Sequence, residues 1–342
     1  MTSERGVAGA RSVDESDVMR AVPRRPLAAL VFVGVSALAP LGCTAGAADD
    51  AGTPAEDAGV ADHRPAPFLD ACATDPACTD VLLVAHRGEG VDEPENTIAA
   101  VVAVAAAGAD VVEIDVRETS DGVLVVLHDD TLSRTTDQEA RFPDRARVDE
   151  LTLAEVKSLT IYDEGARCAS PDDDVARCRV PTLRELLAAA RGHAIVMLDY
   201  KAGALSTLAD DIVAEDAASF AFFFDANEAN LDEMEARVAG LVTMPRASDA
   251  TTGLEILQRR APRLLHADAP TVGALVDQAA ESDTKLFINV FIEVDFGIIG
   301  HELTGDAESL GQAEDALAAV VDDGADLLQS NRTPVLRAML AE

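Results

Sequence analysis

Short apolar runs alternate along this chain with longer segments that mix alanine, leucine and charged residues. The short runs, rich in valine, isoleucine and leucine, predict strands buried on both faces, and the longer segments predict helices. Strands that alternate with helices in this way are typical of a parallel α/β fold. The runs that predict strands lie at residues 81–85, 111–116, 123–127, 194–198, 220–224, 241–244, 263–266, 286–291 and 327–329.

Helices are predicted over 96–107, 152–159 and 181–191, with further helical runs between the later strands. Thr152 should cap the second of these helices, with Glu155 completing a capping box. The length that remains after an N-terminal targeting segment suits one (β/α)8 TIM barrel of roughly 250 residues. Eight strands fill such a barrel, so one candidate must lie outside it, and we expect that strand to be 263–266.

Residues 1–43 predict an export signal. A basic segment around Arg24 precedes an apolar run at 26–39, which is too short to span a membrane. The run ends at Cys43 in a pattern that resembles a bacterial lipobox, where the cysteine carries a lipid anchor. An ordinary secretory signal and an uncleaved anchor are the alternatives, and Met19 could be the true start. We therefore expect an exported protein, lipid-anchored at Cys43 in the cell envelope or secreted.

Residues 44–78 are rich in alanine, aspartate, glycine and proline and predict a flexible linker and lead-in. The catalytic domain is then expected at 79–342. Four cysteines remain beyond Cys43, and an even number in an exported protein favours two disulfides. Close spacing favours Cys72–Cys78 and Cys168–Cys178, although three pairings are formally possible. A zinc site is the alternative, but the spacings are longer than those of common zinc knuckles.

The formal net charge is −35, with 62 aspartate and glutamate residues. Such a field repels nucleic acid, so we expect no nucleic-acid partner. Most of these carboxylates are expected to be solvated surface. An anionic substrate would need a bound cation and a few local basic side chains to reverse the charge around it.

Several polar residues lie at the ends of the first four predicted strands: His86 and Arg87, Glu113 and Asp115, His128, and Asp199 and Lys201. The carboxyl ends of barrel strands converge on one mouth, where active sites lie, so these side chains should meet there. Glu113 and Asp115 are two apart on a strand and point the same way. With Asp199 they would supply hard oxygen ligands, which favour Mg²⁺ or Ca²⁺ over zinc. A solvated acidic strand edge is the alternative.

The two histidines can exchange protons with a reacting hydroxyl and a leaving alkoxide. Arg87 and Lys201 can bind phosphate oxygens, arginine as a fork and lysine as a point charge. Together with a bound cation, His86 and His128 would suit phosphoryl transfer through stabilised negative charge.

These residues stand in a longer motif that resembles the glycerophosphodiester phosphodiesterase family. The motif comprises His86-Arg87-Gly88, Pro94-Glu95-Asn96-Thr97, Gly108-Ala109-Asp110, Asp121-Gly122, His128-Asp129 and Arg134-Thr135-Thr136. The resemblance implies a (β/α)8 barrel that uses a divalent cation to hydrolyse glycerophosphodiesters to glycerol 3-phosphate and an alcohol. It implies attack by the glycerol 2-hydroxyl, giving a cyclic phosphate that water then opens.

Carried onto this sequence, the resemblance makes Glu113, Asp115 and Asp199 metal ligands and His86 and His128 the acid–base pair. It makes Arg87 and Lys201 phosphate contacts. It also implies that both disulfide loops flank the barrel mouth. Asn96 could cap the first helix.

The sequence departs from the family pattern at three places. Asp199 stands where glutamate is usual, the seventh strand at 288–293 lacks a tryptophan, and 330–334 replace the usual Thr-Asp-x-Pro. Asp199 with Lys201 also fits the related phospholipase D and sphingomyelinase D-like barrels, which act on lysolipids. A non-catalytic surface lipoprotein is the third alternative.

Overall fold

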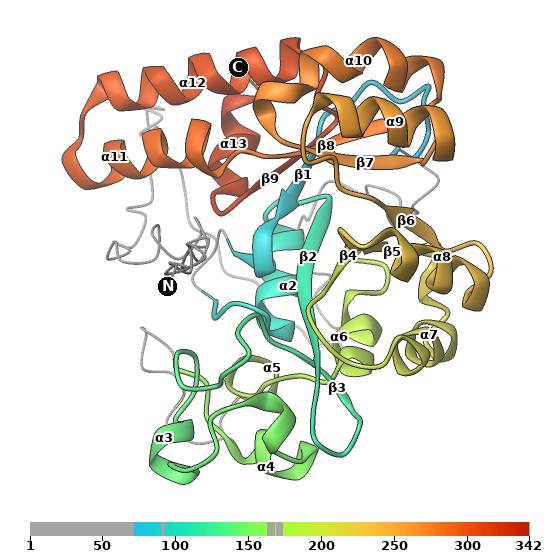
Figure 1. Ribbon diagram of the computed structural model, residues 1–342. Helices are drawn as coiled ribbons and strands as arrows, with labels where there is room; N and C mark the ends of the chain where they lie inside the picture. Colours follow the sequence, from blue (N-terminus) through green and yellow to red (C-terminus); the bar gives the residue numbers. More distant parts are fainter. Residues whose placement is uncertain (1–71, 90–92, 163–167, 169–173, 342) are drawn as a thin grey trace, which may run out of the picture.

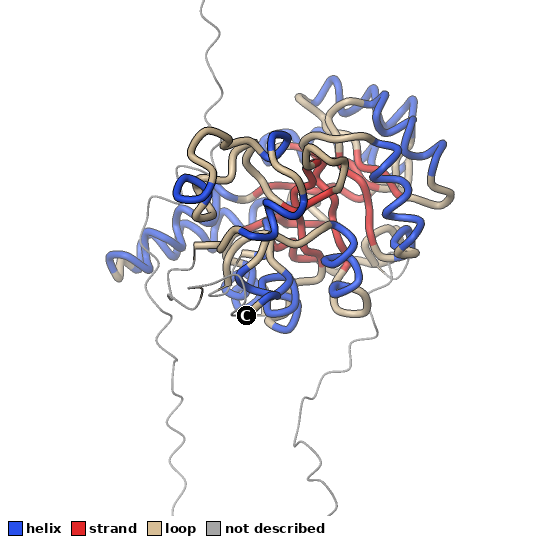
Figure 2. Tube along the Cα trace, turned by 90° about the horizontal axis from the view of Figure 1, so that it is seen from below, coloured by secondary structure: helices blue, strands red, loops and turns tan. Residues whose placement is uncertain are grey.

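Parallel strands form a barrel wall and helices pack around it (Figures 1 and 2). The computed structural model describes residues 72–89, 93–162, 168 and 174–341. The barrel strands are β1 (Leu82–Ala85), β2 (Val111–Glu118), β4 (Ile195–Tyr200), β5 (Ala221–Phe224), β6 (Val242–Met244), β7 (Leu264–Ala267), β8 (Lys285–Asn289) and β9 (Leu327–Ser330).

The strands follow the order β6-β5-β4-β2-β1-β9-β8-β7. Two backbone hydrogen bonds join the ends of this row: the amide of His266 donates to the carbonyl of Pro245 at 3.0 Å, and the amide of Ala247 donates to the carbonyl of His266 at 2.8 Å. The sheet thereby closes on itself, and the predicted (β/α)8 barrel is confirmed.

The helices that follow the barrel strands cover the outside of the wall. They are α2 (Ile98–Ala106), α6 (Leu183–Ala190), α7 (Leu205–Ala214), α8 (Glu228–Arg237), α9 (Ala250–Arg260), α10 (Val272–Glu281), α11 (Phe296–Thr304), α12 (Ala307–Asp322) and α13 (Thr333–Met339). Short turns η1 (His86–Gly88), η3 (Ala217–Ser219), η4 (Ala269–Thr271) and the π-helical turn η5 (Phe291–Asp295) lie between strands and helices. Among the described residues, none of the helices combines the length and apolar character needed to cross a bilayer.

The strand that lies outside the barrel is β3 (Leu124–Val126), so the expectation for 263–266 is wrong. β3 pairs antiparallel with β2, and β7 is a full member of the wall. Residues 119–123 alone connect β2 to β3, whereas a parallel crossover needs a dozen residues or more. Gly122, at φ +78°, supplies the left-handed backbone of this hairpin turn.

β3 begins an insertion that stands apart from the barrel at the lower end of Figure 1. It continues through α3 (Gln138–Arg141), η2 (Val148–Glu150), α4 (Leu153–Ser158) and α5 (Val175–Cys178). Its apolar side chains form a cluster of their own: Val125, Leu127, Leu132, Val148, Leu151, Val156, Leu159, Ile161 and Val180. The predicted capping box of Thr152 and Glu155 at α4 is confirmed.

The residues before α2 differ from expectation in one respect. Thr97, not Asn96, caps α2, because the Thr97 side chain accepts from the amide of Ala100 at 3.1 Å. Asn96 has a left-handed backbone at φ 58° and points its amide group elsewhere, as described below.

Both predicted disulfides, Cys72–Cys78 and Cys168–Cys178, are present. The first does not flank the mouth as expected. Ala73, inside its loop, is fully buried and packs on the interior residues of the barrel. The carbonyl of Cys78 accepts from Lys285, the first residue of β8. The Cys72–Cys78 loop therefore closes the base of the barrel, where the strands begin.

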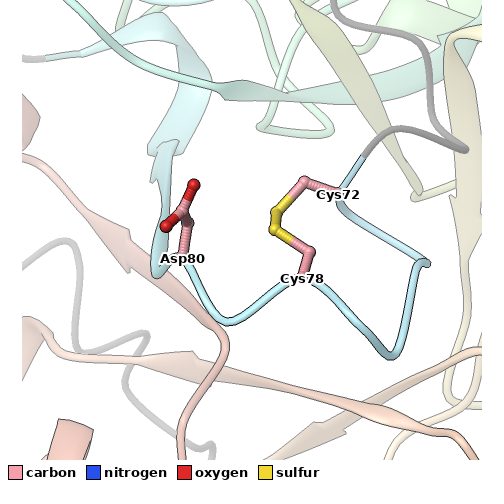
Figure 3. A group of neighbouring side chains, drawn as sticks. All are labelled: Cys72, Cys78 and Asp80. Carbon is pink, nitrogen blue, oxygen red and sulfur yellow. A yellow bond between two sulfur atoms is a disulfide. The ribbon is translucent and has the colours of Figure 1, made fainter.

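Asp80 lies beside the Cys72–Cys78 disulfide (Figure 3). Because both sulfur atoms are bonded to each other, neither is available as a thiolate ligand, and this group is not a metal site. The predicted signal, Cys43 and most of the predicted linker lie outside the described residues.

Candidate active site

The first barrel strand leads directly into a strained turn that holds His86 and Arg87. Arg87 and Gly88 both have left-handed backbones, at φ 54° and 71°. The amide of Arg87 donates to Glu113 Oε2 at 2.8 Å. A non-glycine residue in this region of backbone space is costly, and it persists where surrounding contacts fix it. Here the hydrogen bond to Glu113 ties the turn after β1 to β2.

Three carboxylates gather at the mouth from neighbouring strands. Glu113 and Asp115 lie on β2, and Asp199 on β4 pairs in register with Asp115. One oxygen of each lies within 4.8 Å of the others. Glu113 and Asp115 are fully buried, and Asp199 is partly exposed. Ile114, between the first two, faces the outer helix layer.

Burial and mutual repulsion dominate the electrostatics of these acids. Burial, together with Asp115 and Asp199, raises the pKa of Glu113 well above its usual range. Burial also raises the pKa of Asp199, against the opposing effect of Lys201. Burial alone would raise the pKa of Asp115, but Arg87 and Lys201, and then His128 and His86, lower it below its ordinary value.

The two basic residues of the site lie against the same carboxylate. Lys201 Nζ lies 2.9 Å from Asp199 Oδ2 and 3.3 Å from Asp115 Oδ1. Arg87 Nε lies 3.4 Å from Asp115 Oδ2. Both cations are thus engaged with the acidic cluster, Arg87 with 1% of its side chain exposed and Lys201 with 25%. Lys201 is the one that a molecule entering the mouth can reach.

The acidic cluster has the chemistry of a divalent-cation site. Glu113 Oε1 is buried and has no hydrogen-bond partner among the described residues, and a buried carboxylate oxygen without a partner is costly. Asn96 orients Asp115 by donating to its Oδ2 at 2.8 Å and accepting from its amide at 3.2 Å. Three carboxylate oxygens in one place are the ligands that Mg²⁺ and Ca²⁺ prefer. The residues present fit such an ion.

The two histidines reach this cluster from different elements. His86, 7% exposed, follows β1, and its Nε2 lies 4.0 Å from Glu113 Oε2. His128 follows β3, where the amide of Leu127 donates to the carbonyl of Asp115 at 3.0 Å. The sequence pattern predicts His128 at the end of a parallel strand. The hairpin instead folds it back toward β2, so the histidine arrives at the site from the insertion.

Each imidazole has a hydrogen-bond partner at Nδ1. His128 Nδ1 lies 2.8 Å from Asp129 Oδ1, and Asp129 is held in turn by Arg134 at 2.5 Å. Burial would raise the pKa of Asp129, but the hydrogen bonds from His128 and Arg134 lower it below its ordinary value. Arg134 also makes a two-pronged contact with Glu95 at 2.9 Å. Arg134, the first residue of the Arg134-Thr135-Thr136 motif, therefore supports His128 through Asp129.

The partners of His86 are residues that the sequence did not indicate. Its Nδ1 lies 2.8 Å from Asn331 Oδ1, and its ring centroid lies 4.7 Å from that of Phe291. Behind Asn331, Asp295 is fully buried and accepts from the Asn331 amide at 2.8 Å. Burial raises the pKa of Asp295 to about 7, although hydrogen bonds from Ser330 and Asn331 oppose this. The departure from Thr-Asp-x-Pro at 330–334 was the available signal.

The structure thus brings all seven predicted site residues to one end of one barrel: His86, Arg87, Glu113, Asp115, His128, Asp199 and Lys201. A (β/α)8 barrel with proton-exchanging side chains and a candidate cation cluster at its mouth is the arrangement of a barrel enzyme.

Comparisons with known proteins show a similarity to one family. The model of the glycerophosphoryl diester phosphodiesterase family matches residues 86–223, which contain every one of these site residues. Over residues 86–223 the chain is similar to this family.

The curated relatives match over a limited segment. Glycerophosphodiester phosphodiesterase 1 of Rattus norvegicus is 43% identical over 106 residues, which are 31% of this chain and 29% of the rat protein. The glycerophosphodiester phosphodiesterase of Caldanaerobacter subterraneus subsp. tengcongensis is 43% identical over 105 residues, which are 31% of this chain and 38% of that protein. The chain thus matches about a third of the length of these relatives.

Solved structures are similar over most of the barrel. A glycerophosphoryl diester phosphodiesterase from Parabacteroides distasonis has a TM-score of 0.61 at 22% identity, covering 79% of this chain and 90% of that one. A phosphodiesterase of Oleispira antarctica, solved with the product sn-glycerol-3-phosphate, has a TM-score of 0.59 at 21% identity, covering 76% and 97%. At this identity the likeness establishes the fold.

Proposed function

We propose that this protein hydrolyses glycerophosphodiesters to glycerol 3-phosphate and an alcohol, with a divalent cation held by Glu113, Asp115 and Asp199. The observation that carries the proposal is the cluster of these three carboxylates with the partnerless Glu113 Oε1 among them. The match of residues 86–223 to the family model supports the reaction class. The product bound to the Oleispira antarctica protein supports glycerol 3-phosphate as the product here.

The cation, when bound, would offset the negative charge that develops on the phosphate oxygens. Lys201 would add a second positive charge at the mouth. Arg87, which is buried against Asp115, would bind phosphate only by exchanging that contact, and its role as a phosphate contact stays a prediction.

His86 and His128 would move the protons. One takes a proton from the glycerol 2-hydroxyl as its oxygen bonds to phosphorus, and the other donates a proton to the departing alcohol oxygen. The product of this step is a cyclic phosphate. In a second step, the histidines exchange roles, a water oxygen bonds to phosphorus, and the ring opens to glycerol 3-phosphate.

The activity is tested by incubating the full chain with glycerophosphocholine, glycerophosphoethanolamine, glycerophosphoinositol and glycerophosphoglycerol, and measuring glycerol 3-phosphate. We expect release that EDTA abolishes and that added Mg²⁺ or Ca²⁺ restores. Phosphorus NMR during turnover would detect the cyclic phosphate. Activity that is unchanged by EDTA would contradict the cation assignment. Activity confined to lysolipids or sphingomyelin would favour the phospholipase D-like alternative.

The histidine assignment is tested by His86→Ala and His128→Ala. Each should lower kcat by a factor of about 10² or more with the fold intact by circular dichroism. The matched control is His193→Ala, because His193 is exposed. A non-catalytic surface protein would show no turnover in any of these forms.

We also propose that the chain is exported and lipid-anchored at Cys43. The two disulfides support an oxidising compartment, where such bonds persist. Cells given labelled palmitate should label the wild-type protein and leave Cys43→Ser unlabelled. Equal labelling of the two proteins would contradict the anchor at Cys43. Recovery of the wild-type protein from the medium without label would favour an ordinary secretory signal.

A further inference from the structure

The ends of β1 and β9 place His86 beside Asn331. The two strands are parallel neighbours, and Ala85 pairs with Ser330. The residues that follow each strand therefore stand side by side at the mouth. His86 Nδ1 and Asn331 Oδ1 lie 2.8 Å apart, and both residues are buried, at 7% and 4% exposed.

A second layer of hydrogen bonds fixes Asn331 from behind. Asp295, at the end of the π-helical turn η5, accepts from the Asn331 amide at 2.8 Å and from the Ser330 hydroxyl at 2.6 Å. Asp295 is fully buried, so no water competes for these bonds. The π-helical turn therefore anchors the segment that carries the partner of His86.

This contact selects one form of the imidazole. The Asn331 amide is oriented with Oδ1 toward the ring, and in that orientation the oxygen can only accept, so the hydrogen in the bond belongs to His86 Nδ1. A neutral imidazole with its proton on Nδ1 carries its lone pair on Nε2. Nε2 is the atom that faces the acidic cluster, 4.0 Å from Glu113 Oε2.

We propose that Asn331, held by Asp295 and Ser330, is a positioning residue that fixes His86 with its proton on Nδ1, so that every proton exchanged with substrate passes through Nε2. A carboxylate at 331, as in the family's usual pattern, would accept the same hydrogen bond but add a charge beside the imidazole. Here the carboxyl group lies one hydrogen bond further back, on Asp295. The statement about substrate rests on the proposed function, but the statement about the tautomer does not.

The tautomer is measured directly by nitrogen-15 NMR of the full chain with labelled histidine, in the presence and absence of Mg²⁺. The chain has six histidines, and His86→Ala identifies the signals of His86. We expect a protonated Nδ1 and an unprotonated Nε2 in the neutral ring. The opposite pattern in the wild type would overturn the proposal, whether or not the protein turns over any substrate.

The functional consequence is tested at position 331. Asn331→Leu removes the acceptor and should lower kcat by about 10-fold or more with KM within about twofold, while the His86 ring shifts toward the Nε2-protonated form. Asn331→Asp restores an acceptor and should recover most of kcat. Asn230→Leu, on α8, is the matched control and should leave kcat unchanged.

A structural role for Asn331 predicts different results. In that case, Asn331→Leu and Asn331→Asp would lower stability and activity together, with the His86 tautomer unchanged in whatever folded fraction remains, and the proposal would be wrong. If the wild type hydrolyses none of the tested diesters, the proposed function fails, while the NMR pattern still decides the tautomer.

Discussion

His266 makes folding sensitive to acid in a way that can be calculated from its surroundings. It lies on β7 with 2% of its surface exposed, and within the described part of the chain neither ring nitrogen has a hydrogen-bond partner. Its ring stands edge-on between Phe224 and Phe287, with centroids 5.2 and 5.1 Å away. Burial, aided by the nearby charge of Arg246, lowers the pKa of His266 from 6.5 to about 3.

The sign of the effect follows from where each state binds its proton. The unfolded chain protonates His266 as the pH falls below 6.5, whereas the folded chain does so only near pH 3. Between these values, acid favours the unfolded state. The lost free energy of unfolding is about 2 kcal/mol at pH 5 relative to pH 8, and it keeps growing toward pH 3.

The perturbation is His266→Leu, which has a similar volume and no titrating atom. Urea unfolding at pH 8 and pH 5 gives the free energy of unfolding of each form. We expect the drop between the two pH values to be about 2 kcal/mol smaller in the variant. Titrations common to both proteins cancel in this difference, and His193→Leu, at an exposed site, should leave the drop unchanged. Equal drops in wild type and His266→Leu would refute the reasoning.

Three further changes have expected outcomes. Gly297→Ala should lower the free energy of unfolding by about 1–3 kcal/mol, because its Cβ would lie 2.7 Å from a backbone oxygen of α12. Gly311→Ala, with open space around it, should raise the free energy of unfolding by up to about 1 kcal/mol. Urea unfolding measures both changes, and a gain in stability from Gly297→Ala would contradict the packing. Cys72→Ser with Cys78→Ser should cost about 2 kcal/mol in the same assay, and no change would mean that the loop closes the barrel base without the bond. Mg²⁺ or Ca²⁺ at a hundred times its Kd should stabilise the wild type against thermal unfolding by about 2.7 kcal/mol. The same ion should leave the stability of Glu113→Gln unchanged. Equal stabilisation of both proteins would mean that the ion binds elsewhere.

The apolar pattern of the sequence predicts the fold correctly for the elements whose side chains are buried. The barrel strands are buried on both faces, so their sequences are continuous apolar runs that mark them out. The same pattern cannot distinguish a wall strand from an equally buried hairpin strand, and β3 was misplaced for that reason. The short connection after β2, with its Asp121-Gly122 turn, carried the missing information.

The site was predictable where its residues follow strand ends in one motif. The three carboxylates and His86 come from β1, β2 and β4, and register alone brings them together. The contact between His86 and Asn331 spans 245 residues and depends on which strand closes the barrel beside β1. The sequence pattern specifies strands but not their neighbours across such a distance, so this partner could only come from the structure.

The loop at the barrel base has a practical consequence for handling the protein. Cys72 joins the barrel on the side where the strands begin, opposite the end at which the acidic cluster stands. A purification tag, a fluorescent domain or a solid support attached ahead of Cys72 therefore meets the barrel at its far end. In a protein immobilised through this end, the mouth of the barrel stays accessible to substrate in solution.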